Sequence, residues 1–70
     1  MAEVRAEMVA NVWRVVVAEG DQVSEGDTLV ILESMKMEIP VLAEESGTVT
    51  KLHVAEGDVV QEDDLIAVID

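Results

Sequence analysis

Lys36 is the residue whose type and setting stand out most in this sequence. It lies between Met35 and Met37 in the segment Leu32–Glu38, which reads LESMKME. The chain has only two lysines, and a lysine that merely solubilised a surface would not need a methionine on each side. Methionine is unbranched and polarizable, so it adapts to different contact surfaces. The segment predicts a specific task for Lys36, with the two methionines either contacting partners or packing against the end of the domain.

The other polar residues do not make an enzyme active site. The chain has no cysteine, and its single histidine, His53, falls in a predicted strand, so a nucleophile, a base and an orienting group cannot be assembled. The two acidic turns that contain Asp21, Glu25 and Asp27 carry carboxylates, but the D-x-D-x-D-G loop of a calcium site is absent. We expect no catalytic residues and no metal site, and we interpret these acidic residues as solvated.

The composition predicts a small all-β protein with an acidic surface. Val, Ile and Leu supply 23 of the 70 residues, and Val alone supplies 14. Branched side chains of this kind favour strands. Sixteen acidic residues against four basic ones leave a net charge of −12, which disfavours nucleic acid and anionic membrane surfaces as partners. The acidity either favours a basic protein partner or serves only to keep the protein in solution.

The chain is also predicted to work without crossing a membrane. No apolar run approaches the roughly 20 residues that span a bilayer. The first residues, MAEVRAEM, lack the charged-then-apolar order of a signal peptide. We expect residues 1–70 to form one domain, monomeric and cytoplasmic.

An internal repeat at an offset of 37 residues organises the chain. Residues 4–32 align with residues 41–69 with 12 identical pairs among 29 positions. The strongest stretch matches VAEGDQVSEGDTLVIL, residues 17–32, to VAEGDVVQEDDLIAVI, residues 54–69. The repeat predicts two similar halves that share one core and are related by a pseudo-twofold axis.

Each half reads as short strands joined by tight turns. Val12 and Val15 lie three positions apart, which breaks strict alternation and predicts a β-bulge at Trp13–Arg14 and at its repeat mate. In a later turn Gly26 matches Asp63, so if Gly26 has a positive φ, Asp63 must have one too. The continuous apolar runs at 29–32 and 65–69 are typical of strands buried in a sandwich or barrel.

The segment around Lys36 is predicted to be a β-hairpin, although its residues favour a helix. Seven residues without a convincing cap make a marginal helix, and the segment joins two strand-like runs, 29–32 and 39–42. The repeat mate of this hairpin falls where the chain begins and ends. We therefore expect Lys36 at one end of the domain and both termini at the other, which is the geometry of a displayed group.

Together these features resemble the biotinyl/lipoyl attachment domain. The hexapeptide at 33–38, ESMKME, is similar to the biotinyl-lysine motif, and the flanking EGD-x-V-x-x-GD-x-L pattern is similar to the rest of that domain. The resemblance covers essentially the whole chain and is to single-domain attachment proteins of the biotin carboxyl carrier type. It implies a flattened β-barrel, the hammerhead fold, of two four-stranded antiparallel sheets with pseudo-twofold symmetry. Ser34 replaces the commoner alanine of the motif, and Asp63 replaces a usual glycine.

The resemblance implies that a biotin protein ligase attaches biotin to Lys36 by an amide bond. Amide formation removes the ammonium charge and leaves a long, neutral arm. The arm would carry a carboxyl group between biotin carboxylase and carboxyltransferase partners, and Met35 and Met37 would aid presentation and ligase recognition. The alternative is a lipoyl carrier for acyl transfer in a 2-oxo acid dehydrogenase complex. Lipoyl domains typically have Asp before the lysine, so the methionines favour biotin; a further alternative is a protein that only binds a partner.

Trp13 is predicted to be a surface residue near the hairpin end. Its repeat mate is the polar Thr50, while Val12 and Val15 belong to the inward-facing set. The resemblance adds that the turn at Val9–Asn11 lies beside the lysine hairpin. Trp13 either helps a partner to dock, as interface aromatics often do, or fills a shallow groove on the barrel.

Overall fold

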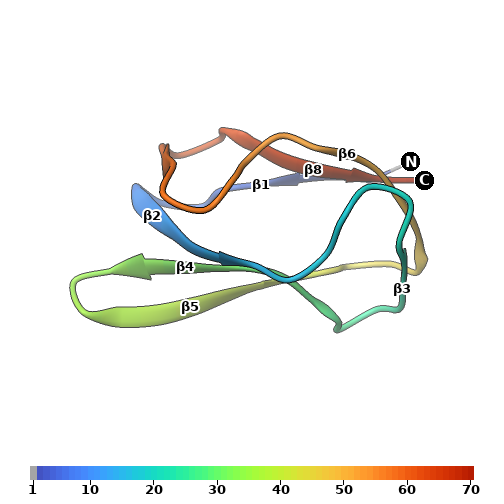
Figure 1. Cartoon of the computed structure of the whole chain (residues 1–70), viewed down its shortest axis with the longest axis horizontal. Coiled ribbons are helices and arrows are strands. Elements are labelled where there is room, and N and C mark those ends of the chain that lie inside the picture. The colour runs from blue at the N-terminus through green and yellow to red at the C-terminus, as the bar shows by residue number, and fades with distance from the viewer. Residues whose placement is uncertain (1) are drawn as a thin grey trace.

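A computed structural model describes residues 2–70, and within them all regular structure is β-strand. The strands form two antiparallel sheets of four, in the orders β1-β8-β6-β3 and β5-β4-β2-β7. Figure 1 shows the two layers packed face to face. The predicted fold is confirmed. The strands are β1 (Ala2–Arg5), β2 (Ala10–Val15), β3 (Gln22–Val23), β4 (Thr28–Ser34), β5 (Met37–Leu42), β6 (Gly47–Leu52), β7 (Val59–Val60) and β8 (Leu65–Ile69).

The predicted pseudo-twofold symmetry is present down to the pairing register. The offset of 37 residues maps β2 onto β6 and β3 onto β7 residue for residue, and it exchanges the two sheets. Ala2 pairs with Ile69 in the same way as Ile39 pairs with Leu32. The β1–β8 pair is therefore the mate of the β4–β5 hairpin, and Figure 1 shows the chain ends and this hairpin at opposite ends of the long axis, as predicted.

One aliphatic core lies between the sheets and draws on both halves of the repeat. Three pairs of repeat mates supply most of its fully buried side chains. Burial of each such side chain stabilises the fold by about 1.5–3 kcal/mol. Val15 and Leu52, the other predicted inward residues, are partly buried and pack against this core. The largest buried side chains are Leu29, Leu32, Ile66, Ile69, Val12, Val30 and Val49.

The predicted β-bulges are present, at Trp13 in β2 and at the equivalent place in β6. Just beyond the first bulge the N–H of Val15 donates to Glu56 Oε2 at 3.3 Å. In the other half the N–H of Leu52 donates to Glu19 Oε2 at 3.0 Å. Each half therefore supplies a carboxylate that satisfies a backbone donor freed by the bulge of the other half.

The aspartates of the acidic turns bind their own backbone. Asp21 Oδ2 accepts the N–H of Ala18, three residues earlier, at 2.9 Å. The same contact recurs in three further turns, where it closes the chain reversal as an Asx-type contact does. These carboxylates thus have a structural task in shaping the turns. The further contacts join Asp27 to Ser24, Asp58 to Ala55 and Asp64 to Gln61.

The predicted left-handed residue in the second half is confirmed. Gly26 has a φ of 92° and Asp63 a φ of 73°. This region costs an ordinary L-residue about 1–2 kcal/mol, and aspartate somewhat less because its side chain can bond locally. The carbonyl oxygen of Asp63 also accepts a hydrogen bond from Arg5 Nη1 at 2.9 Å.

We expect Asp63→Gly to raise the free energy of unfolding by less than about 1 kcal/mol. Glycine removes the strain of the positive φ, but it loses more backbone entropy on folding. The hydrogen bond from Arg5 goes to the main chain and survives the change. Urea unfolding measures the difference, and Gly26→Asp is the matched control, in which stability should fall. A loss of stability in Asp63→Gly would show that the aspartate side chain does more for this turn than the strain costs.

Candidate functional site

Strands β4 and β5 form a hairpin whose turn consists of Met35 and Lys36 alone. Ser34 pairs with Met37 as the last rung before the turn. Met35 has a φ of 52° and Lys36 a φ of 64°, and two positive values make this a type I′ turn. The prediction of a hairpin rather than a helix is confirmed.

The type I′ turn is unusual in its residues. Such turns favour Asn-Gly, because both central residues need a positive φ. Met35 and Lys36 each hold this conformation at a cost of about 1–3 kcal/mol. Backbone strain of this kind gathers at functional sites. The positive φ values of Met35 and Lys36 therefore make this turn a candidate functional site.

The side chains at the tip are directed to solvent. Met35 is 91% exposed and Met37 65% exposed, and Lys36 is exposed as well. Neither methionine is packed into the end of the domain, so that alternative interpretation is wrong. Both thioethers are free to contact another protein at either side of the lysine.

The immediate surroundings of Lys36 are acidic but do not bind its amine. Glu33 and Glu38 lie directly opposite each other on β4 and β5, and Asn11 of β2 lies on the other side of Glu33. Within residues 2–70, no carboxylate forms an ion pair with Lys36. Lys36 is therefore an exposed residue at the tip that takes part in no ion pair within the described residues. The pairing of Asn11 with Glu33 also confirms that the turn before β2 lies beside the hairpin.

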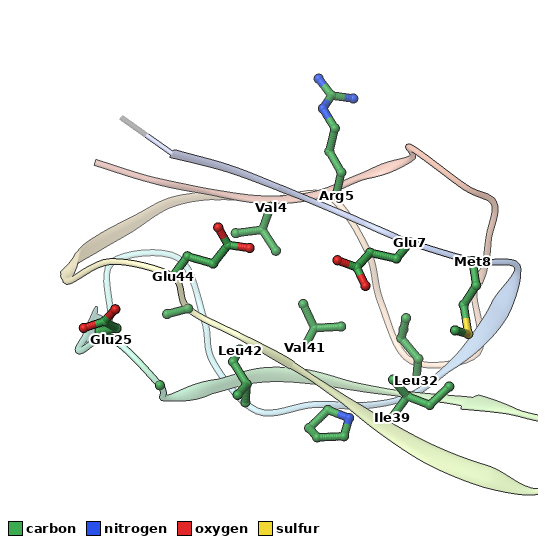
Figure 2. A pocket seen from close by; sticks show the side chains of 13 residues that line it. Val4, Arg5, Glu7, Met8, Glu25, Leu32, Ile39, Val41, Leu42 and Glu44 are labelled. Carbon is green, nitrogen blue, oxygen red and sulfur yellow. The ribbon is translucent and has the colours of Figure 1, made fainter.

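A groove elsewhere on the domain does not include the lysine. It lies between the edge strands β1 and β5, which are repeat mates and belong to different sheets. Figure 2 shows Glu7 and Glu44 directing their carboxylates into this groove over an aliphatic floor, while Arg5 points away from it. No residue of the Met35–Met37 tip lines it. The tip thus displays its lysine in the open and not inside a preformed pocket.

The structure places the remaining singled-out residues on the surface. Trp13 is 43% exposed, as predicted, and Arg14 Cζ lies 4.9 Å from the centroid of its ring. His53 is exposed and lies one residue beyond β6, so its predicted place within the strand is wrong. The strand ends at Leu52 because the chain there leaves its sheet for β7 in the other one. The N–H of His53 still donates to the Ile66 carbonyl at 2.8 Å.

Comparison with known proteins adds to this geometry. The sequence model of the biotin/lipoyl family, described as biotin-requiring enzyme, matches residues 2–69. The chain belongs to this family. The prediction made from the ESMKME motif and the repeat is therefore confirmed.

Two bacterial proteins are very similar in sequence to this family member. The "biotinylated protein TB7.3 homolog" of Mycolicibacterium smegmatis is 80% identical over 44 residues, which are 61% of this chain and 62% of that protein. The protein of the same name from Mycobacterium leprae is 71% identical over 48 residues, which are 67% of this chain and 68% of that one. The matched region therefore spans slightly less than two thirds of the first relative and slightly more than two thirds of the second.

A solved structure supports the fold of this family member over nearly its whole length. The crystal structure of Kluyveromyces lactis urea carboxylase matches 99% of this chain with a TM-score of 0.92 and 40% sequence identity. The matched part is 6% of that much longer chain. The same fold thus occurs as a small part of a large carboxylase.

Sequence reasoning missed one group of surface residues in this family member. One row across the hairpin sheet holds Arg14, Ile31 and Pro40, with Ile31 in the middle. A signal was available in the repeat, because Pro40 aligns with the charged Glu3 and Trp13 with Thr50. Departures from the repeat at exposed positions could have identified this face before the structure did.

Proposed function

We propose that this chain is a biotin carrier in which Lys36 holds the cofactor through an amide bond. The observation that carries the proposal is the strained two-residue turn, which displays Lys36 between two exposed methionines at the end of the domain opposite the termini. The biotinylated relatives support biotin as the attached group. The same relatives favour biotin over the lipoyl alternative, and the experiment below separates the two.

The residues of this chain supply attachment and presentation. The free amine of Lys36 takes the acyl group, and loss of its charge leaves a neutral arm that can enter a partner's active site. The exposed side chains of Met35 and Met37 adapt to the different protein surfaces that meet the tip. Bound biotin supplies the chemistry, because its ureido nitrogen accepts and releases a carboxyl group.

The proposed partners are a biotin protein ligase, a biotin carboxylase and a carboxyltransferase. Carboxylase partners are supported by the urea carboxylase, in which the same fold makes up 6% of the chain. We propose that the chain itself contributes no catalytic residue, and that it acts as a monomer in the cytoplasm. Within residues 2–70 the structure has no helix long and apolar enough to cross a membrane.

Intact-mass measurement tests the function directly. The purified protein is incubated with ATP and either biotin and a biotin protein ligase, or lipoate and a lipoate ligase. We expect one biotinyl group per chain in the first reaction and no adduct in the second. A lipoyl adduct alone would replace the proposal with its alternative, and the absence of both adducts would refute the carrier function.

A further inference from the structure

We propose that the outer face of the β5-β4-β2-β7 sheet, centred on Trp13, is the docking surface for the biotin protein ligase that acts on Lys36. The inference rests on the proposed function, because it assumes that Lys36 is the biotinylated residue. It adds a protein-recognition surface that lies away from the hairpin tip, on the flank of the same sheet (Figure 1).

The face is defined by one row of side chains across three strands. Arg14 of β2 lies opposite Ile31 of β4, which in turn lies opposite Pro40 of β5. The row before it holds Val12 and Leu32, each 2% exposed, and points into the core. Because side chains alternate between the two faces of a sheet, the row that contains Ile31 points outward. Arg14 and Pro40 are exposed and Ile31 is partly exposed.

Trp13 occupies the bulge beside this row and is held in place by its neighbour. The Arg14 guanidinium carbon lies 4.9 Å from the centroid of the indole ring, within the range of a cation–π contact. The ring nevertheless remains 43% exposed. Tryptophan and arginine are the residue types most enriched among the residues that dominate protein interfaces. An exposed indole in contact with Arg14, on the same sheet face as Ile31 and Pro40, is therefore suited to enter a pocket of another protein.

The internal repeat provides a comparison within the same molecule. On the other sheet the equivalent row consists of Lys51, Val68 and Glu3, and Thr50 replaces Trp13. Two of these polar residues bind within the domain: the Thr50 hydroxyl donates to the Val68 carbonyl at 3.2 Å, and Glu3 forms an ion pair with Arg5 at 2.8 Å. The shared backbone folds with these polar residues. The fold therefore does not require the tryptophan and proline on the hairpin sheet.

Distance along the hairpin indicates which partner covers this face. Pro40 lies three residues beyond Met37, about 10 Å along the strand. The ligase must bring its active site to the Nζ atom of an unmodified lysine, so its surface has to approach the flanks of the hairpin. A biotinylated lysine reaches farther from the tip than a bare lysine does. A carboxylase partner can therefore bind the cofactor without approaching the flanks of the hairpin as closely as the ligase must.

Charge also indicates what the ligase surface should contain. Glu33 and Glu38 lie between the row of Arg14, Ile31 and Pro40 and the turn of the hairpin. They face outward, directly opposite each other. Like charges at such positions are unfavourable for the free domain. The net charge of the chain is −12. The complementary ligase surface should therefore have an apolar pocket for the indole, bordered by lysine or arginine side chains.

Steady-state biotinylation kinetics with exchanged repeat residues test the proposal. In Trp13→Thr and Pro40→Glu, each residue is replaced by the one its repeat mate carries. We expect Trp13→Thr to raise the KM for the protein substrate about tenfold, with kcat changed less than twofold and with an unchanged urea midpoint. Pro40→Glu should raise KM further when combined with it. The matched controls on the other sheet, Thr50→Ala and Lys51→Ala, should leave KM unchanged.

A binding measurement that needs no reaction supports the kinetics. Trp13 is the only tryptophan of the chain, so labelling with 5-fluorotryptophan gives a single ¹⁹F resonance. In the unreactive Lys36→Arg variant this resonance should shift or broaden as ligase is added.

Two results would overturn the docking surface. One is an unchanged KM in Trp13→Thr, and the other is a ¹⁹F resonance that ligase does not move. If the unchanged KM is accompanied by slowed carboxylation of the biotinylated Trp13→Thr variant, the face belongs to a carboxylase partner instead. Each of these results can be distinguished from failure of the carrier function, because that failure would leave the wild-type protein without biotin.

Discussion

Lys36→Arg will carry no biotin after incubation with an active biotin protein ligase, whereas the wild-type protein will carry one biotinyl group. Arginine keeps the positive charge and the length of the side chain, so the acidic surroundings and the solubility of the tip are preserved. Its guanidinium group stays protonated and does not offer a free amine for acylation. Intact-mass measurement detects the loss, which should be complete.

Lys51→Arg is the matched control for this variant. Lys51 is the only other lysine of the chain and lies exposed in β6 opposite Val68. Its repeat mate is Arg14, so the position holds a positive charge in both halves and not specifically an amine. We expect full incorporation of biotin in Lys51→Arg. Label retained by Lys36→Arg, or lost from Lys51→Arg, would move the attachment site away from the hairpin tip.

Leu29→Ala and Ile66→Ala should each lower the free energy of unfolding by about 2–5 kcal/mol. Both side chains are fully buried, and they are repeat mates that enter the core from opposite sheets. A domain of this size has only about 4–10 kcal/mol of stability, by the usual 0.05–0.15 kcal/mol per residue. Either truncation should therefore unfold a measurable fraction of the protein, as urea titration will show.

The two core variants also test whether residues 1–70 behave as one unit. Because one core joins both halves, unfolding followed by circular dichroism and by Trp13 fluorescence should give a single coincident transition. Two separate transitions would mean that the halves are independent. Val59→Ala serves as the surface control, since Val59 is 62% exposed and its truncation should change stability by less than about 0.5 kcal/mol.

The choice between helix and hairpin at Lys36 shows how the repeat improved the prediction. Local propensity alone favours a helix for LESMKME, because leucine, glutamate, methionine and lysine are all good helix formers. The repeat requires a strand on each side of this segment, and the structure has β4 and β5 there. Propensity is a weak local term, and pairing with the rest of the sheet outweighs it.

The predicted strand position of His53 is wrong because local strand propensity and long-range strand pairing disagree at this residue. Its repeat mate, Val16, is an ordinary strand former, and alignment with it suggested a strand position. The structure ends both strands one residue earlier, at Val15 and Leu52, because each chain segment then crosses to the other sheet. A crossing point depends on which strands pair in space, so a strand propensity cannot locate it.

The sequence by itself determined the two-halved all-β fold, the bulge at Trp13, the shared backbone conformation of Gly26 and Asp63, and the position of Lys36 opposite the termini. Each follows from a pattern that occurs twice, so one half constrains the other. Only the tertiary structure decided that Met35 and Lys36 hold strained left-handed backbone, and that Arg14, Ile31 and Pro40 form one exposed row. The turn has no mate within the repeat, and the row joins residues of three strands. Both depend on pairing register, which is set by contacts between distant segments and not by any local run of residues.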